Sequence, residues 1–123
     1  TDTREISHGG DVRITSIESV TSEARIPGEI VGPAIRVTVQ IDAGAKPVDL
    51  SRVVVNAYFG KKNTPAIEAM GPGVKLFSGE LQAGKSRTGV FVFNIPKSER
   101  GAVTIEFIHG GSRKPLMFQG AVS

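Results

Sequence analysis

Apolar and polar residues alternate along much of the chain, with the period of two that is typical of β-strands with one buried face. The alternation is most regular at 35–41, IRVTVQI, which predicts a central strand. A second regular run, from Leu81 to Pro96, begins with a polar glycine turn and continues as GVFVFNI. Proline cannot donate a ladder hydrogen bond, so Pro96 is expected to end this strand.

Weaker runs predict further strands at 11–20, 52–59 and 103–108. The first of these changes phase between Ile14 and Ile17, which indicates a β-bulge. Prolines and glycines between residues 61 and 73 leave room only for short strands at 66–70 and 74–77. A glycine-containing hairpin loop at 109–114 is expected to lead into a last strand at 116–118.

Seven or eight short strands separated by turn residues predict an all-β protein, an antiparallel β-sandwich of seven or eight strands. The 123 residues suit one domain at 11–123, preceded by a polar N-terminal tether at 1–10. Because the chain begins with Thr1, we expect a leader or an anchor upstream. The predicted core contains alternate residues of several strands: Ile35, Val37, Val39, Val53, Val55, Phe91, Phe93, Ile105 and Phe107.

The stretch from Gly79 to Ser86 matches the phosphate-binding motif G-x-x-x-x-G-K-[ST]. That motif binds phosphate only when a helix follows, because the helix N-terminus supplies the amides and the dipole. Here a strand pattern follows and Pro96 would interrupt a helix. We therefore expect a turn between strands at Lys85, and no nucleotide or other cofactor.

The segment L-x-x-G-x-x-x-x-G-V-x-V-F-x-I-P at 81–96, followed by V-x-I-x-F at 103–107, resembles an immunoglobulin-like family of bacterial secreted proteins and lipoproteins. This family includes the immunoprotective extracellular antigen and many domains of unknown function. The strand IRVTV at 35–39 followed by KPVDL at 46–50 resembles an earlier segment of the same family. The resemblance implies an immunoglobulin-like β-sandwich that is extracytoplasmic and not an enzyme.

Residues that could support catalysis are few and scattered. His8 and His109 have no metal-ligand spacing, and no G-x-S-x-G turn presents a nucleophile. Asp42 and Asp49 flank a loop that could offer oxygens to calcium, but Lys46 lies between them and an Asx-turn at Asp42 explains the pattern better. With no cysteine in the chain, disulfides are excluded. We expect no enzyme activity and no metal.

A net charge of +3 and a pI near 9.5 make the chain mildly basic. Its basic residues are not interleaved with stacking aromatics, so we expect no nucleic-acid partner. No apolar run is long enough to form a transmembrane segment. These features favour a binding module of the bacterial cell envelope, whose partner is another envelope protein or an anionic polymer. A purely structural spacer or subunit domain of a larger exported protein is the alternative.

If consecutive strands are antiparallel, the connections at 42–51, 79–86 and 109–114 should emerge at one end of the sandwich, where loops commonly bind partners. Glycine amides beside basic side chains could close on an anionic group there. A plain hairpin turn is the alternative, and the opposite end, with Lys61, Lys62, Lys97 and Arg100, is about as basic. The candidate partner-binding residues are Lys46, Lys85, His109, Gly110, Gly111, Arg113 and Lys114.

Overall fold

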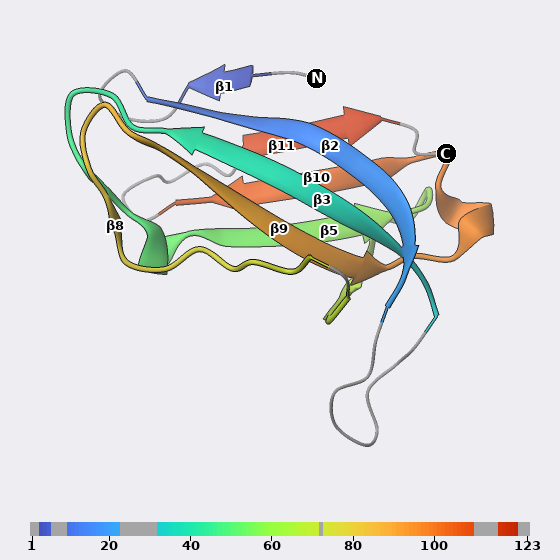
Figure 1. The fold of residues 1–123 in the computed structure, drawn as a ribbon. Coiled ribbons are helices and arrows are strands. Elements are labelled where there is room, and N and C mark those ends of the chain that lie inside the picture. The colour runs from blue at the N-terminus through green and yellow to red at the C-terminus, as the bar shows by residue number, and fades with distance from the viewer. Residues whose placement is uncertain (1–2, 6–9, 23–31, 72, 110–115, 121–123) are drawn as a thin grey trace.

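A computed structural model describes residues 3–5, 10–22, 32–71, 73–109 and 116–120, and it is built almost entirely from antiparallel strands (Figure 1). One sheet has five strands in the order β1-β2-β3-β9-β7, a second has four in the order β11-β10-β5-β6, and β4 and β8 form a small third sheet. The long strands are β2 (Asp11–Thr21), β3 (Pro33–Asp42), β5 (Val54–Phe59), β9 (Ser86–Asn94), β10 (Val103–Ile108) and β11 (Leu116–Gly120). The short strands are β1 (Thr3–Glu5), β4 (Val48–Asp49), β6 (Thr64–Pro65), β7 (Ile67–Ala69) and β8 (Glu80–Leu81).

Strand β3 is the middle strand of the five-stranded sheet, as its regular alternation predicts. Its inward residues pair with inward residues of β9, with Ile35 opposite Phe93 and Val37 opposite Phe91. On its other side β3 pairs with β2, and the register shifts between Ile14 and Ser16. The bulge predicted from the change of phase in this strand is therefore confirmed.

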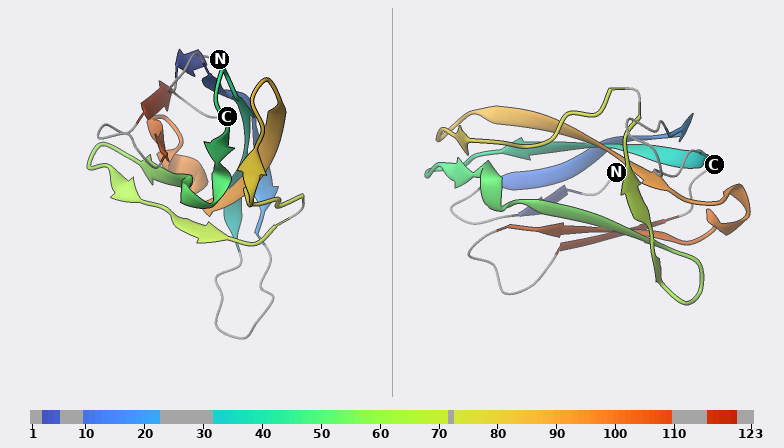
Figure 2. Two further views of the ribbon diagram at one scale, coloured as in Figure 1. Left: turned by 90° about the vertical axis from the view of Figure 1, so that its left-hand side faces the viewer. Right: turned by 90° about the horizontal axis from the view of Figure 1, so that it is seen from below.

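The four-stranded sheet faces the five-stranded sheet, and both contribute side chains to one core (Figure 2). Ile105 and Phe107 of β10 lie opposite Ala57 and Val55 of β5, and all four side chains are buried. Of the nine residues predicted for the core, eight are buried in it and Val53 is partly buried against it. The predicted all-β class and the single core are confirmed.

Residues 61–78 carry the chain from one sheet to the other. Strand β6 pairs with β5 in the four-stranded sheet, and β7 then pairs with β9 in the five-stranded sheet. The strand predicted at 74–77 is reduced to a single bridge between Lys75 and Val90. The right-hand view of Figure 2 shows the later, yellow part of this segment running beside β9 (orange), with β5 (green) farther from β9.

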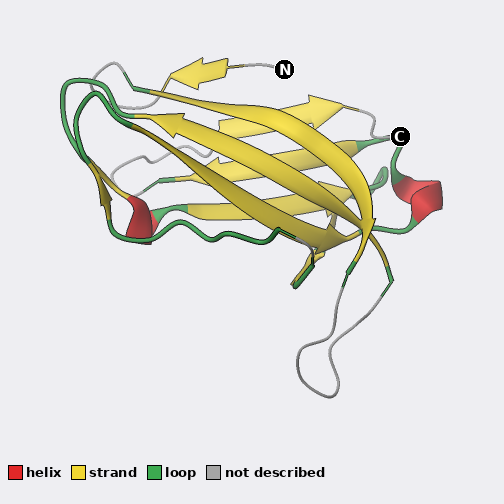
Figure 3. Ribbon diagram, viewed as in Figure 1, coloured by secondary structure: helices red, strands yellow, loops and turns green. Residues whose placement is uncertain are grey.

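Several short elements were not predicted. Two of them are single turns of 3-10 helix, η2 (Leu50–Arg52) and η3 (Lys97–Glu99), and they are the only helices of the described residues (Figure 3). A third is β1, which lies within the expected tether and pairs with β2. With five strands of only two or three residues, the described part of the chain forms eleven strands rather than seven or eight.

The glycine turn that resembles a phosphate-binding loop leads into strand β9, and no helix follows it. Gly79 and Gly84 have positive φ angles of 72° and 76°, which glycine adopts at little cost. Lys85 lies between them and the strand, so the expected turn between strands is confirmed. Within the described residues, no helix is long and apolar enough to cross a membrane.

Candidate functional site

The turns at 42–51 and 79–86 lie side by side at one end of the molecule, as the sequence predicts (Figure 1). Main-chain hydrogen bonds join them, from Ala43 N–H to the Lys85 carbonyl at 2.8 Å and from Gly84 N–H to the Gly44 carbonyl at 3.1 Å. Lys46 and Lys85 are both exposed on these turns. We call this surface the basic end.

His109 lies at the same end as the two lysines. The last residue of β10, Ile108, pairs with Val54, which follows directly after η2 and Val53. The His109 ring packs near the Phe107 ring at 6.0 Å between centroids, and partial burial lowers the pKa of the imidazole. Gly110, Gly111, Arg113 and Lys114 lie outside the described residues. Binding at the basic end therefore remains a prediction.

Arg100 does not belong to the surface charge expected at the opposite end. Only 4% of it is exposed, and its guanidinium donates to Ser19 Oγ at 2.8 Å and to the Ala34 carbonyl at 3.0 Å. It also reaches the Ile95 carbonyl at 3.4 Å. These contacts attach the turn after β9 to β2 and β3. The expectation that Arg100 adds to an exposed basic surface is wrong, because the cation is used to satisfy buried oxygens.

Asp42 and Asp49 do not converge on a common point. The Asp49 carboxylate accepts hydrogen bonds from the N–H and the hydroxyl of Ser51 and so begins η2. Asp42 instead accepts from Gln40 at 3.0 Å and from the Ser86 hydroxyl of the neighbouring strand. The Asx-turn predicted at Asp42 is wrong, because that carboxylate accepts from side chains of its own and the neighbouring strand, and the local turn of this kind occurs at Asp49. No group of three or more histidine, aspartate or glutamate side chains gathers in the described part of the chain.

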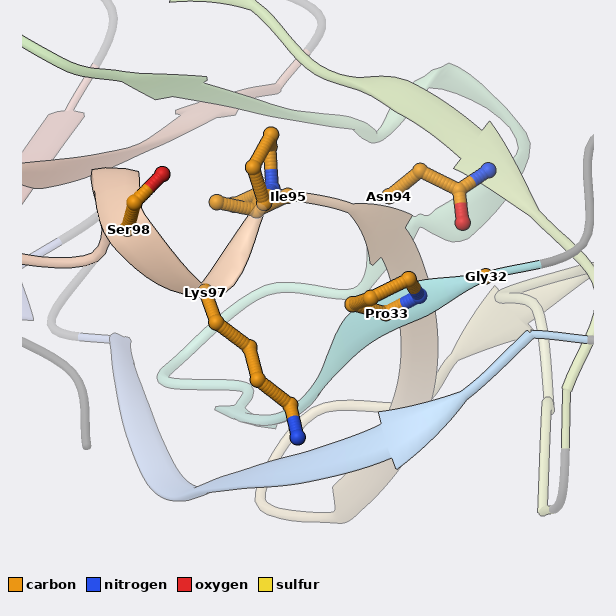
Figure 4. A pocket seen from close by; sticks show the side chains of 7 residues that line it. Gly32, Pro33, Asn94, Ile95, Lys97 and Ser98 are labelled. Atoms are coloured by element: carbon orange, nitrogen blue, oxygen red, sulfur yellow. The ribbon is translucent and has the colours of Figure 1, made fainter.

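A hollow of about 560 Å³ lies where β3 begins and β9 ends (Figure 4). Its walls are mostly apolar, and the residues that line it are Gly32, Pro33, Asn94, Ile95, Pro96, Lys97 and Ser98. Asn94 Oδ1 accepts a hydrogen bond from Ser22 Oγ at 2.7 Å, whereas its buried Nδ2 has no hydrogen-bond partner among the described residues. Among the described residues that line this hollow, Lys97 is the only charged one.

A second hollow, of about 270 Å³, opens on the flank of the molecule between β5 and the segment 74–77. We call it the side groove. Its lining is apolar apart from one amide and one carboxylate, and it consists of Val53, Val54, Val55, Asn56, Glu68, Leu76, Phe77 and Phe91. The groove exists because the single bridge at Lys75 leaves this side of the two sheets without a continuous strand to close it.

Gly89 allows the wall of the side groove to approach β9. A Cβ atom at this position would lie 2.7 to 3.0 Å from the Phe77 ring, which is too close for carbon atoms that do not share a bond. With glycine there, Phe77 packs onto the strand and also contacts the Phe91 ring, with centroids 5.6 Å apart. Phe77 is thereby fixed between the core and the groove.

The rims of the side groove expose apolar surface to solvent. Val54 is 47% exposed and Leu76 is 57% exposed, and they are two of the four large apolar side chains that stand out from the described surface. Exposed apolar residues that gather around a hollow commonly mark a binding surface. Glu68 lies among them on β7, and partial burial raises the pKa of its carboxyl group.

The side groove was not predicted from the sequence. Val54 lies between two inward residues of its strand, but an exposed valine is common on any sheet. Leu76 and Glu68 lie in the irregular region that the prolines and glycines interrupt, so their facing direction could not be read from alternation. The one available signal was the apolar pair Leu76 and Phe77 in a segment too broken to form a buried strand.

Comparison with known proteins supports the fold. No family model matches the sequence, and neither does any curated protein. Two solved structures from Bacillus subtilis match over nearly the whole chain. One is ycdA, a candidate lipoprotein, with a TM-score of 0.72, 16% identity and 98% of this chain covered. The other is yjhA, with a TM-score of 0.69, 15% identity and 99% covered.

The two neighbours differ in how much of their own length is matched. This chain corresponds to 39% of ycdA and to 97% of yjhA. The fold therefore occurs both as one part of a longer protein and as nearly all of a short one. At these identities the similarity shows a shared fold.

Proposed function

We propose that this chain is a non-catalytic binding module of the bacterial cell envelope and that it contacts its partner through the side groove. The observation that carries this proposal is the exposure of Val54 and Leu76 around a hollow between β5 and the segment 74–77. Water-exposed apolar side chains cost free energy unless a partner covers them, and here they flank a concave surface.

The extracytoplasmic location is supported by the description of ycdA as a candidate lipoprotein. It is also supported by the resemblance of segments 35–50 and 81–107 to an immunoglobulin-like family of secreted proteins and lipoproteins. Two facing antiparallel sheets around one core are compatible with an immunoglobulin-like sandwich. We therefore place the module outside the cytoplasm, in an immunoglobulin-like fold.

The basic end is the competing surface for the same function. Lys46 and Lys85 are exposed on adjacent turns, and an anionic polymer would bind there through charge rather than through apolar contact. Binding through charge weakens as the salt concentration rises, whereas apolar contact depends on salt much less. The two surfaces therefore predict different salt dependence.

Retention of the purified chain on isolated bacterial envelope tests the proposal. We expect the double variant Val54→Lys with Leu76→Lys to lose most of its retention, and a matched variant with Lys46→Glu and Lys85→Glu to keep it. Circular dichroism of both variants checks that they are folded. Loss only in the second variant would assign binding to the basic end, and unchanged retention of both would favour a structural spacer.

A further inference from the structure

One rim of the side groove presents main-chain groups to a partner. Lys75 donates its N–H to the Val90 carbonyl at 3.0 Å and accepts from the Val90 N–H at 2.8 Å. Adjacent residues of a strand direct these groups to opposite sides. Leu76 directly follows this bridge, where an extended chain would direct its N–H and carbonyl away from β9. Neither group has a hydrogen-bond partner among the described residues.

The other rim is also a strand edge. Strand β6 pairs only with Tyr58 and Phe59 of β5, and beyond them the Ala57 carbonyl accepts from Ala66 N–H at 2.8 Å. The part of β5 from Val54 to Asn56, which lines the groove, thus extends past the end of β6. Open strand edges recruit further strands, and many proteins use them to bind extended peptides.

Glu68 gives the groove a charge. It lies opposite Phe93 in the ladder between β7 and β9, so both side chains are on the face of the sheet that is directed toward the core. Among the described residues, the carboxylate of Glu68 forms no ion pair or hydrogen bond. Glu68 is exposed at this strand edge beside the apolar lining of the groove, and its carboxylate is complementary to a lysine or arginine that arrives from a partner.

We propose that the side groove holds an extended segment of a partner protein, which pairs with the main chain of Leu76 and directs a lysine or arginine side chain to Glu68. The inference rests on the proposed function and names the chemistry of the partner. A strand of about six residues would span the groove, with alternate side chains directed inward onto Val54 and Phe77. The added strand would close the side of the molecule that the broken 74–77 segment leaves open.

A charge swap tests the pairing with Glu68. The probe is a synthetic peptide of about six residues in which valine and threonine alternate around one central lysine. A second probe carries glutamate instead of lysine. In an NMR titration the parent chain should bind the lysine peptide about tenfold more tightly, and Glu68→Lys should reverse this preference. The matched control is Glu80→Lys, an exposed acid on β8 outside the groove, which should keep the parent's preference.

A second pair of variants tests the main-chain contact. Leu76→Pro removes the N–H that the partner strand would use, whereas Leu76→Ala keeps the N–H and removes only the apolar side chain. We expect about tenfold or greater loss of lysine-peptide binding in the proline variant and a smaller loss in the alanine variant. The proton spectra of both variants show whether the fold is retained. Equal binding by the two variants would overturn the strand pairing.

The outcomes separate this inference from the proposed function. If the double variant Val54→Lys with Leu76→Lys loses envelope retention but neither peptide binds, or both bind equally, the inference fails and the groove remains the contact surface. If the double variant also keeps its retention, both fail. Reversal of the peptide preference in Glu68→Lys, together with loss of retention in the double variant, supports both.

Discussion

Arg100 is a buried cation that serves as a hydrogen-bond donor within the fold. Its buried guanidinium pairs with no carboxylate among the described residues, and it donates to the main-chain carbonyls of Ala34 and Ile95 and to the hydroxyl of Ser19. Buried acceptors without a donor cost about 1 to 3 kcal/mol each. Arg100 is therefore a structural residue of the turn between the two larger sheets.

Replacement of Arg100 by alanine should lower the free energy of unfolding by on the order of 3 kcal/mol, because two buried carbonyls and one hydroxyl lose a donor. Urea denaturation measures the change. The control is Lys97→Ala in the same turn, where the exposed side chain should contribute no more than about 0.5 kcal/mol. A stability of Arg100→Ala equal to that of Lys97→Ala would contradict this role.

Asp42 should make the stability depend on acid pH. Hydrogen bonds from Ser86 and Gln40 to the carboxylate, with Arg13 nearby, lower the pKa of Asp42 in the folded chain. The stabilisation is present above the unfolded-state pKa of about 3.9 and is lost as the pH falls through the lower folded-state pKa. Asp42→Asn should therefore be less stable than the parent at pH 7, with the difference shrinking below about pH 4.

Thermal unfolding of the parent and of Asp42→Asn across this pH range checks the prediction for Asp42. The control is the double variant Asp42→Asn with Ser86→Ala. Its stability should depend on pH in the same way as that of Asp42→Asn alone, because neither variant has a carboxylate at position 42 to pair with the Ser86 hydroxyl. A difference between parent and variant that stays constant from pH 7 to about pH 3 would show that the ionised carboxylate does not stabilise the fold.

The packing of segment 74–77 against β9 depends on the absence of a side chain at Gly89. Phe77 occupies the space that a Cβ atom would need and packs against Phe91. Gly89→Ala should therefore displace the ring and cost about 1 to 3 kcal/mol in urea denaturation. In a Phe77→Ala background the same substitution should cost much less, since the clash is gone. Additive effects of the two substitutions would mean that the ring does not rest on Gly89.

Alternation in the sequence predicted the long strands well because each has enough residues to show a period of two. The runs at 35–41 and 89–95 correspond to β3 and β9, and the change of phase at Ile14 corresponds to the bulge of β2. Strands of two residues, such as β4 and β6, carry no readable period. They form because the neighbouring long strands bring their main chains together, which is information that a local pattern does not hold.

The candidate site was predicted less well for a related reason. Lys46 and Lys85 were placed correctly on neighbouring turns, because that followed from counting antiparallel strands. The side groove depends on where the chain fails to form a strand, at 74–77, and on which face of β7 carries Glu68. Neither feature follows from composition or spacing.

The whole molecule is stabilised by one core that both larger sheets share, and Phe93 is among the largest side chains in it, with 1% of its surface exposed. Phe93→Ala should cost about 3 to 5 kcal/mol, from lost burial together with the cavity that remains. Urea denaturation measures the effect. Thr88→Ala on the exposed face of the same strand should change the stability by no more than about 0.5 kcal/mol. A Phe93→Ala variant as stable as the Thr88→Ala variant would exclude the common core.

Contact with an envelope partner through the side groove is most directly tested by photo-cross-linking. A benzophenone amino acid is introduced at Leu76 in one variant and at Lys46 of the basic end in another, and each folded variant is irradiated on isolated envelope. We expect the variant with the probe at position 76 to form a defined cross-linked product, and we expect the variant with the probe at position 46 to form little. Cross-linking from position 46 with none from position 76 would contradict the account.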